Sequence, residues 1–421
     1  MRTADLALET LTLEDVDWAQ RVAISVPMHT AMRLADETAA HIKSRRPRLP
    51  VAFYGLYAGL GSVTVDARLE GEYEPGLLDW AAGETAGRHR HLGRSEFHVP
   101  DRAGLPRIDR YARLESRGST VLAGAVEASH GCRHRCRHCP IPAIYDGRMR
   151  IVPRDTVLAD IDNLVAAGAG HITFGDADFL NAPAHSLSLL EQAHSRHPGI
   201  TFDATIKVEH ILDHRHLWSR LAGLNLMFVV SAFESVDERT LSILDKGHTV
   251  ADMAEAIGLT RGAGVHIRPT WLPFLPWTTP QDVADVFEFI DRHGLTGVTD
   301  PVQMAIKLLI PRGSLLVTHP EVTPYLTTYD TAALTWRWVF ADQEIAVLHK
   351  KLETIAASAS DCGQEAALTL NEMREAVSAI SGRDLPVIRD DVAPGPRLSE
   401  SWFCCAEPTE GQSVSIQIGP R

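Results

Sequence analysis

Three cysteines with the spacing C-x3-C-x2-C lie in residues 129–140: Cys132, Cys136 and Cys139. Three thiolates on one short loop can ligate three irons of a [4Fe–4S] cluster and leave the fourth iron open to a substrate. A structural zinc ion is the alternative, with a fourth ligand from a neighbouring histidine of the segment. Structural zinc sites usually pair two C-x2-C knuckles, so the spacing favours the cluster.

Two further cysteines, Cys404 and Cys405, are adjacent near the C-terminus, and Cys362 stands alone. Neighbouring Cα atoms lie about 3.8 Å apart, below the usual disulfide range of about 4.4–6.8 Å, so we expect reduced thiols. Two soft thiolates side by side suit a soft ion or metalloid, such as trivalent arsenic with three sulfur ligands. Cys362 is a candidate for the third ligand, although a lone cysteine in a helical region is more often part of the core.

A regular alternation of strand and helix patterns surrounds the first cysteine motif. Strands are predicted at 122–127, 171–174, 201–206, 226–231, 265–270 and 304–310, and helices at 154–167, 184–194, 215–221, 250–263 and 280–293. Such repeats predict a parallel sheet with helices on its outer face, here a partial, open (β/α)6 barrel. The cysteine loop follows the first strand, at the end of the sheet where barrels of this type carry their chemistry.

The chain divides into four predicted parts. Residues 1–120 form a small α/β unit, with strands at 21–26, 50–57 and 63–69 and helices at 30–43 and 75–82. Residues 121–320 form the partial barrel. Residues 321–389 are helical, with helices at 332–357 and 362–381, and 390–421 is a tail rich in Pro, Gly and Ser. Within this tail, the aromatic and thiol side chains of residues 402–405 are expected to dock on the protein.

Composition excludes several classes of function. The 421 residues carry a net charge of −13, which argues against a nucleic-acid surface. No run approaches the roughly 18–20 apolar residues of a membrane span, and the first twenty residues lack the apolar region of a signal peptide. We expect a cytoplasmic protein.

The cysteine motif and several later segments resemble the radical S-adenosylmethionine (SAM) superfamily over residues 121–320. The resemblance implies a [4Fe–4S] cluster on the three cysteines and SAM as cofactor. It also implies SAM-binding roles for His138 beside the last cysteine, Gly175 and Asp176 after the second strand, Ser231 and Glu234 at the fourth, Arg268 ending the fifth, and Leu309 at the sixth. The residues alone also fit Asp176 as a helix cap, although its place after a strand favours a role in the site, and they fit Arg268 equally as a surface ion pair. Lys207 and Glu209, just past the third strand, read as solvated charges or as substrate contacts.

The N-terminal unit is similar in element order to the cobalamin-binding domains that often precede radical SAM domains, and the Glu70-Gly71-Glu72 turn resembles one found there. The D-x-H-x-x-G motif that supplies a cobalt-ligating histidine is absent, since His29 lacks the flanking Asp and Gly. We therefore expect a degenerate relative and consider cobalamin an unlikely cofactor.

The ending Cys404-Cys405-Ala406-Glu407-Pro408 resembles the tail of the CUAEP/CCAEP-tail radical SAM proteins. It is also similar to arsenic-handling radical SAM enzymes that carry a cysteine pair near the C-terminus. This resemblance implies transfer of the 3-amino-3-carboxypropyl group of SAM to arsenite held by the two cysteines, with a flavodoxin or ferredoxin as electron donor. Two alternatives stay open. One is a 5′-deoxyadenosyl-radical enzyme that acts on an organic small molecule, with the tail in a redox or lid role. The other is a non-catalytic iron–sulfur or zinc regulatory protein.

Overall fold

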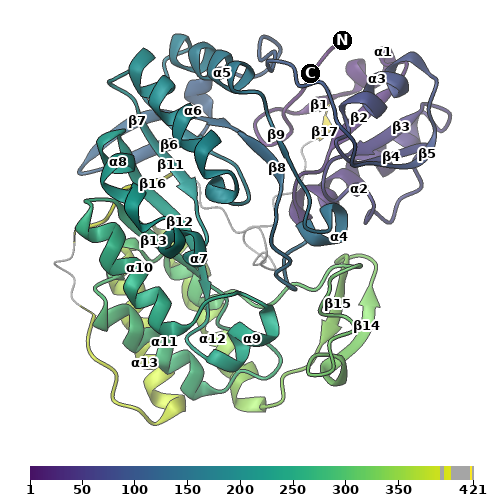
Figure 1. The fold of residues 1–421 in the computed structure, drawn as a ribbon. Helices are drawn as coiled ribbons and strands as arrows, with labels where there is room; N and C mark the ends of the chain where they lie inside the picture. The colour runs from purple at the N-terminus through teal and green to yellow at the C-terminus, as the bar shows by residue number, and fades with distance from the viewer. Residues whose placement is uncertain (389–392, 400–417, 420–421) are drawn as a thin grey trace.

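The computed structural model describes residues 1–388, 393–399 and 418–419. Within them, two α/β units stand next to each other, and a helical region packs beneath the larger one (Figure 1). The first unit contains a parallel four-stranded sheet in the order β2-β3-β4-β5. Its elements are β1 (Leu11–Thr12), α1 (Leu13–Trp18), β2 (Val22–Ser25), α2 (His29–Arg45), β3 (Val51–Tyr54), β4 (Ala67–Gly71), α3 (Glu74–Ala82) and β5 (Gly87–His91).

The predicted strands and helices of this first unit are found as β2, β3, β4, α2 and α3, whereas β1, α1 and β5 were not anticipated. β3 forms the centre of the sheet because Val51, Ala52 and Phe53 are fully buried. β5 pairs with β4 at the sheet edge, and all five of its residues are exposed. Its sequence of Gly, Arg and His therefore lacks the alternation by which half-buried strands are predicted.

The second unit is a curled sheet in the order β13-β12-β11-β10-β7-β6-β16, with helices on its outer face (Figure 1). Five strands are parallel: β7 (Ser119–Val126), β10 (His171–Phe174), β11 (Thr201–Thr205), β12 (Leu226–Glu234) and β13 (His266–Trp271). Two short antiparallel strands, β6 (Arg113–Ser116) and β16 (Arg397–Leu398), extend the β7 edge. The helices are α5 (Arg154–Ala166), α6 (Pro183–Arg196), α7 (Val208–Asp213), α8 (Trp218–Gly223), α9 (Glu238–Leu244), α10 (Val250–Gly262) and α11 (Pro280–Arg292).

The two faces of this sheet differ in chemistry. Alternate residues such as Ile172, Val229 and Phe233 join helix residues in one large apolar core. The opposite face lines the inside of the curled sheet and carries polar groups. His171 and Asp203, both buried there, share a hydrogen bond of 2.7 Å between Nε2 and Oδ1. The fold therefore places a polar lumen inside the curve, with the carboxyl ends of the parallel strands at its mouth.

A sixth barrel strand was expected at 304–310, and this prediction is wrong. Residues Pro301–Ala305 form a 3-10 helix, capped by the Asp300 side chain, which accepts a hydrogen bond from the backbone of Val302. Only a parallel bridge between Phe274 and Lys307 follows. Proline at the first helical position favours this turn over an extended strand.

The region after the barrel also differs from its prediction. A hairpin of β14 (Leu326–Asp330) and β15 (Thr335–Trp338) occupies the start of the predicted helix 332–357. The helices that follow are α12 (Gln343–Cys362) and α13 (Ala366–Ser381). β6, expected in the first domain, belongs to the barrel sheet, and β17 (Ile418–Gly419) pairs with β1.

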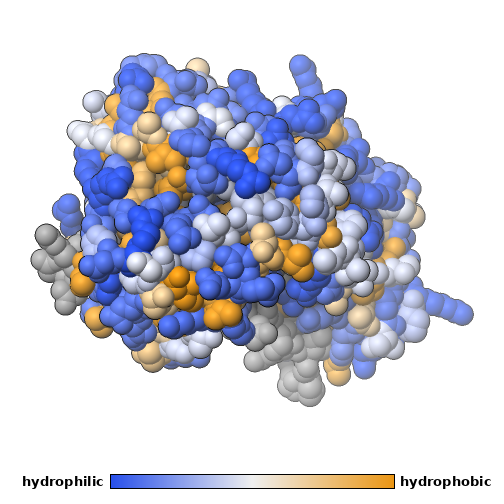
Figure 2. All heavy atoms as spheres, turned by 90° about the horizontal axis from the view of Figure 1, so that it is seen from below, coloured by the Kyte–Doolittle hydropathy of each residue, from blue (hydrophilic) through white to orange (hydrophobic). Residues whose placement is uncertain are grey.

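The surface seen from below is mainly hydrophilic, with apolar residues in small groups (Figure 2). Among the described residues, no helix has the length and apolar character needed to cross a membrane.

Candidate active site

The three cysteines lie in the loop that leaves β7 and forms the small hairpin of β8 (Ser129–Gly131) and β9 (Met149–Ile151), with α4 (Ile141–Tyr145) between its strands. Gly131 has a φ of +76°, and a Cβ there would meet the Arg148 carbonyl oxygen at 2.5 Å. The Cys132 amide donates to that same oxygen at 3.2 Å. Glycine is thus required where the chain turns into the cysteine segment.

A second set of contacts joins this loop to the mouth of the barrel. The Arg137 amide donates to the Leu244 carbonyl at 2.9 Å, and its guanidinium donates to the carbonyls of Ser242 and Ile243 at 2.9 and 2.8 Å. These are orphan carbonyls at the C-terminus of α9, where a cation is favourable. The loop is therefore attached to the barrel between Cys136 and Cys139.

The three thiols fit a cluster with one open iron. Burial raises the pKa of Cys132 and of Cys136, and the neighbouring Cys139 raises both further. Asn181 Nδ2 and the His134 amide each donate to Cys132 Sγ at 3.4 Å. Buried sulfurs that receive N–H donors suit thiolates bound to iron.

Structural zinc would need a fourth ligand from a nearby histidine, and one ring nitrogen of each of the three already contacts another side chain. The contacts are His130 Nδ1 to Glu72 at 3.0 Å, His134 Nε2 to His210 at 3.2 Å, and His138 Nε2 to Glu234 at 3.0 Å. His138 Nδ1 has no hydrogen-bond partner among the described residues, so the spacing of the cysteines, rather than these contacts, favours three protein ligands over four.

His138 belongs to a buried group with Glu234 and Lys246. Glu234 Oε1 contacts His138 Nε2 at 3.0 Å and accepts from Lys246 Nζ at 3.2 Å. Burial opposes ionisation, but the charges of Lys246 and His138 prevail and lower the pKa of Glu234 to about 2. Glu234 thus holds the residue next to Cys139 in place.

The other residues expected to bind SAM take varied positions. Asp176 is buried and accepts from the Ala128 amide and the Ser129 hydroxyl, at 2.9 and 2.5 Å. Burial raises its pKa to about 6. Asp176 therefore stabilises the segment that enters the cysteine hairpin and does not cap a helix. The Gly175 amide donates to the Val126 carbonyl at 2.8 Å, in the adjacent strand.

Ser231 and Arg268 lie away from the mouth of the barrel. Ser231 shares the helix-covered face of β12 with Val229 and Phe233, which separates it from the lumen. Arg268 was expected to end its strand, but β13 continues to Trp271. Its Nη1 donates to the Pro396 carbonyl at 3.2 Å, and burial lowers its pKa to about 10. Arg268 is thus a partly buried lumen residue that contacts the C-terminal segment.

The remaining predicted residues divide between described and undescribed parts of the chain. Leu309 is buried. Cys362 ends α12 and is exposed, so it does not belong to the core. Cys404 and Cys405 lie outside the described residues.

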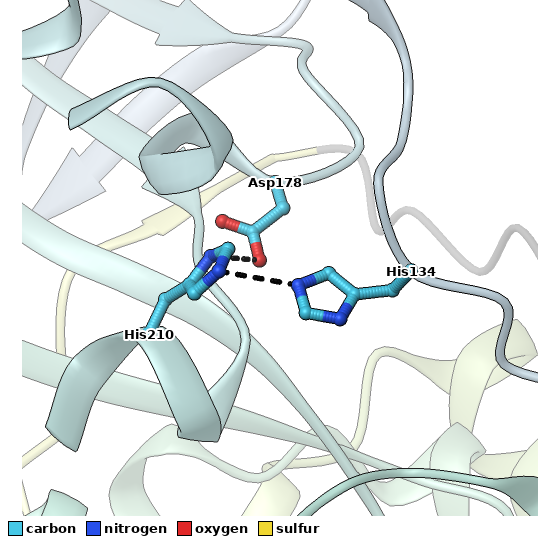
Figure 3. A group of neighbouring side chains, drawn as sticks. All are labelled: His134, Asp178 and His210. Carbon is cyan, nitrogen blue, oxygen red and sulfur yellow. Dashed lines mark hydrogen bonds and ion pairs between the residues drawn. The ribbon is translucent and has the colours of Figure 1, made fainter. Parts of the chain in front are cut away.

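Lys207 is no solvated charge. Its Nζ contacts His134 Nδ1 at 3.1 Å and Glu209 Oε2 at 2.8 Å, and only 10% of its side chain is exposed. Beyond His134 lie His210 and Asp178, whose Oδ2 is 2.9 Å from His210 Nδ1 (Figure 3). Spacing along the chain does not relate these residues, because they come from three separate loops and helices.

The N-terminal unit reaches the site through Glu72, which is completely buried. Glu72 Oε2 contacts His130 Nδ1 at 3.0 Å, and its Oε1 accepts from the Tyr145 hydroxyl at 3.1 Å. His29 is also buried, at the start of α2. His29 also lacks the flanking Asp and Gly of the cobalt-binding motif.

Comparison with known proteins identifies the larger unit. Residues 126–290 match the model of the radical SAM superfamily. These residues form a radical SAM domain. A Hopanoid C-2 methylase from Rhodopseudomonas palustris (strain TIE-1) is 22% identical over 189 residues, which cover 43% of this chain and 35% of the methylase. The chain thus matches about a third of the length of that relative.

Two solved structures share the fold of the radical SAM domain and its surroundings. TsrM from Kitasatospora setae, a radical SAM methyltransferase with tryptophan and a SAM analogue bound, gives a TM-score of 0.54 at 17% identity, covering 68% of this chain and 63% of TsrM. OxsB, a cobalamin-dependent radical SAM enzyme with aqua-cobalamin and SAM bound, gives a TM-score of 0.59 at 14% identity, covering 82% of this chain and 59% of OxsB. The similarity to OxsB means that the fold gives no argument against cobalamin.

Proposed function

We propose that this protein is a radical SAM enzyme that cleaves SAM reductively. The observation that supports it is the loop of Cys132, Cys136 and Cys139, which is attached to the mouth of a polar lumen within the segment that matches the radical SAM superfamily. A [4Fe–4S] cluster bound there would supply the electron that breaks a sulfonium C–S bond. The chain's own part is to hold the thiols, to fix His138 through Glu234 and to shield the lumen.

The specific reaction that we propose is transfer of the 3-amino-3-carboxypropyl group to arsenite held by Cys404 and Cys405. One electron breaks the bond between sulfur and the methionine γ-carbon, which releases methylthioadenosine and a carbon radical. The radical forms a C–As bond and displaces one sulfur ligand as a sulfur radical, which a second electron reduces to thiolate. Arsenic stays trivalent, and a flavodoxin or ferredoxin-type carrier supplies both electrons.

The chemistry of the cysteine pair supports a metalloid over an organic acceptor. Adjacent thiolates are soft ligands, and arsenic in its trivalent state prefers sulfur.

The test compares four variants of the cluster-loaded enzyme with SAM, dithionite and arsenite under anaerobic conditions. C404S and C405S should lose the arsenic product and keep the visible absorbance of the cluster. C362S should keep both, because Cys362 is exposed at the end of α12. Formation of the arsenic product by the C404S/C405S double variant would exclude the thiol-bound acceptor and leave the radical SAM proposal standing.

Methyl transfer to an organic molecule is the second candidate, because the matched relatives include a methylase and a methyltransferase. A cobalamin cofactor would accompany it, as in the aqua-cobalamin structure of OxsB. We propose that cobalamin is not required, since His29 is buried and the cobalt-binding motif is missing. SAM cleavage that depends on added cobalamin would contradict this and favour the methyl-transfer candidate.

A further inference from the structure

A cluster of metal-ligating side chains lies beside the cysteine loop, at the carboxyl ends of β10 and β11 (Figure 3). It consists of His134 in the cysteine loop, Asp178 after β10 and His210 in α7, and one ligand atom from each lies within 4.8 Å of the others. Asp178 is buried, and the side chains of His134 and His210 are 19% and 13% exposed. The group is thus shielded but open to the mouth of the barrel.

The two imidazoles face each other through the atoms that bind metals. Their Nε2 atoms are 3.2 Å apart. Two nitrogens bound to one tetrahedral zinc ion, at about 2.0–2.1 Å each, stand about 3.4 Å apart. The pair therefore needs to open by only about 0.2 Å to admit a cation.

The second nitrogen of His210 is held in the manner of metal ligands. Asp178 Oδ2 lies 2.9 Å from His210 Nδ1, an ion-pair contact that favours a proton on this nitrogen and leaves Nε2 facing His134. A carboxylate on the far nitrogen is the usual partner of a metal-bound histidine. On His134, Glu209 Oε2 lies 3.6 Å from Nδ1 and is the acceptor for the proton that metal binding places there.

The charges near this group suit a cation. The carboxylates of Asp178 and Glu209 outnumber the single ammonium of Lys207, whose Nζ contacts His134 Nδ1. Lys207 must turn away from Nδ1 when a metal occupies Nε2, and Glu209 already binds it at 2.8 Å.

We propose that His134 and His210 bind a divalent cation that prefers nitrogen ligands, represented by Zn²⁺, with Asp178 as the positioning residue of His210. Imidazole ligands select zinc and neighbouring transition metals over magnesium and calcium. Water or a polar group of the substrate fills the remaining positions. This second metal site is separate from the three-cysteine site and does not depend on which molecule accepts the radical.

Zinc itself is the probe, added to full-length protein loaded with its iron–sulfur cluster. A C362S/C404S/C405S background removes the other thiols, and iron and sulfide content verifies that the cluster thiols are occupied. After gel filtration we expect one zinc per chain, with a nitrogen and oxygen shell in X-ray absorption at the zinc edge. H134Q and H210Q should lose this zinc, and D178N should bind it roughly 10–100-fold more weakly.

H216Q is the matched control, because His216 follows α7 and is exposed. It should bind zinc as the parent does. Zinc retained in the H134Q/H210Q double variant, a shell dominated by sulfur, or a parent that binds no more zinc than H210Q would each overturn the proposal. Unchanged iron and sulfide in every variant separates loss of zinc from collapse of the cysteine loop.

Discussion

Glu234 is a fully buried carboxylate beside the cysteine loop, and two partners keep it ionised. Burial opposes the charge, yet Lys246 and His138 lower its pKa to about 2. The folded pKa lies below the unfolded one, so this group contributes stability that is fully present above about pH 4.5. That contribution is lost as pH falls from there toward 2.

E234Q removes the charge and leaves Lys246 buried with a weaker partner. Breaking a buried pair in this way should lower the free energy of unfolding by about 3 kcal/mol at pH 7. The deficit relative to wild type should be nearly constant from pH 7 to pH 5 and should shrink between pH 5 and pH 3, because the wild-type advantage is lost as pH falls through this range. Denaturant unfolding of the cluster-free protein at pH 7, pH 5 and pH 3 measures it.

E255Q serves as the control, because Glu255 forms a surface pair with Arg215. Its effect should stay within about 1 kcal/mol. An E234Q deficit that is equal at pH 7 and pH 3 would show that the charge of Glu234 has no part in stability.

At the scale of elements, the β8–β9 hairpin decides the course of the cysteine loop. G131A places a methyl group at a φ of +76° and 2.5 Å from the Arg148 carbonyl. We expect the hairpin to shift and the reconstituted protein to hold much less iron and sulfide per chain. G118A has the same φ of +76° with nothing within 4 Å of its Cβ. It should keep full iron content, and equal losses in both variants would mean that backbone strain, not the carbonyl contact, is responsible.

Helices and strands are predicted well where apolar residues recur at helical or strand spacing. They are predicted poorly where capping, proline or tertiary packing determines the structure. The helices α5 and α10 and the parallel strands β10 to β12 follow from apolar spacing. The 3-10 helix Pro301–Ala305 occupies the start of the strand expected at 304–310, because proline and the Asp300 cap favour the turn, and the rest forms only a bridge to Phe274. The β14–β15 hairpin forms because its strands pair with each other and pack on the barrel, which no local period reveals.

At the scale of the whole molecule, Glu72 joins the N-terminal unit to the cysteine hairpin. It contacts His130, two residues before Cys132, and Tyr145 in α4. Glu72 directly follows Gly71, the last residue of β4, and the φ of +76° at Gly71 turns the chain toward the barrel. The two units thus share a buried polar contact next to the thiols.

E72Q should weaken this contact and lower the stability of the protein by about 3 kcal/mol, because it leaves buried partners incompletely paired. We also expect faster release of iron to a chelator, since the hairpin loses a support. E84Q is the matched control at an exposed position of the same unit. Iron release at the wild-type rate in E72Q would show that the units are not coupled through Glu72.

Only part of the candidate site could be predicted from the sequence. The cysteines of the cluster loop share one short segment, so their spacing alone predicts the site. His134 and His210 lie 76 positions apart, which is too far for sequence spacing to relate them. Glu72 and His130 likewise meet only through the packing of two units. Such contacts come from tertiary structure, and only the folded chain reveals them.

Reductive cleavage of SAM is the most direct test of the central proposal. Cluster-loaded protein would be incubated anaerobically with SAM and dithionite, with and without arsenite, and the products identified by mass spectrometry. We expect methylthioadenosine together with an arsenic compound that bears the aminocarboxypropyl group, and neither product from C132A. Uncleaved SAM, from protein whose iron and sulfide contents show a full cluster, would contradict the assignment as a radical SAM enzyme.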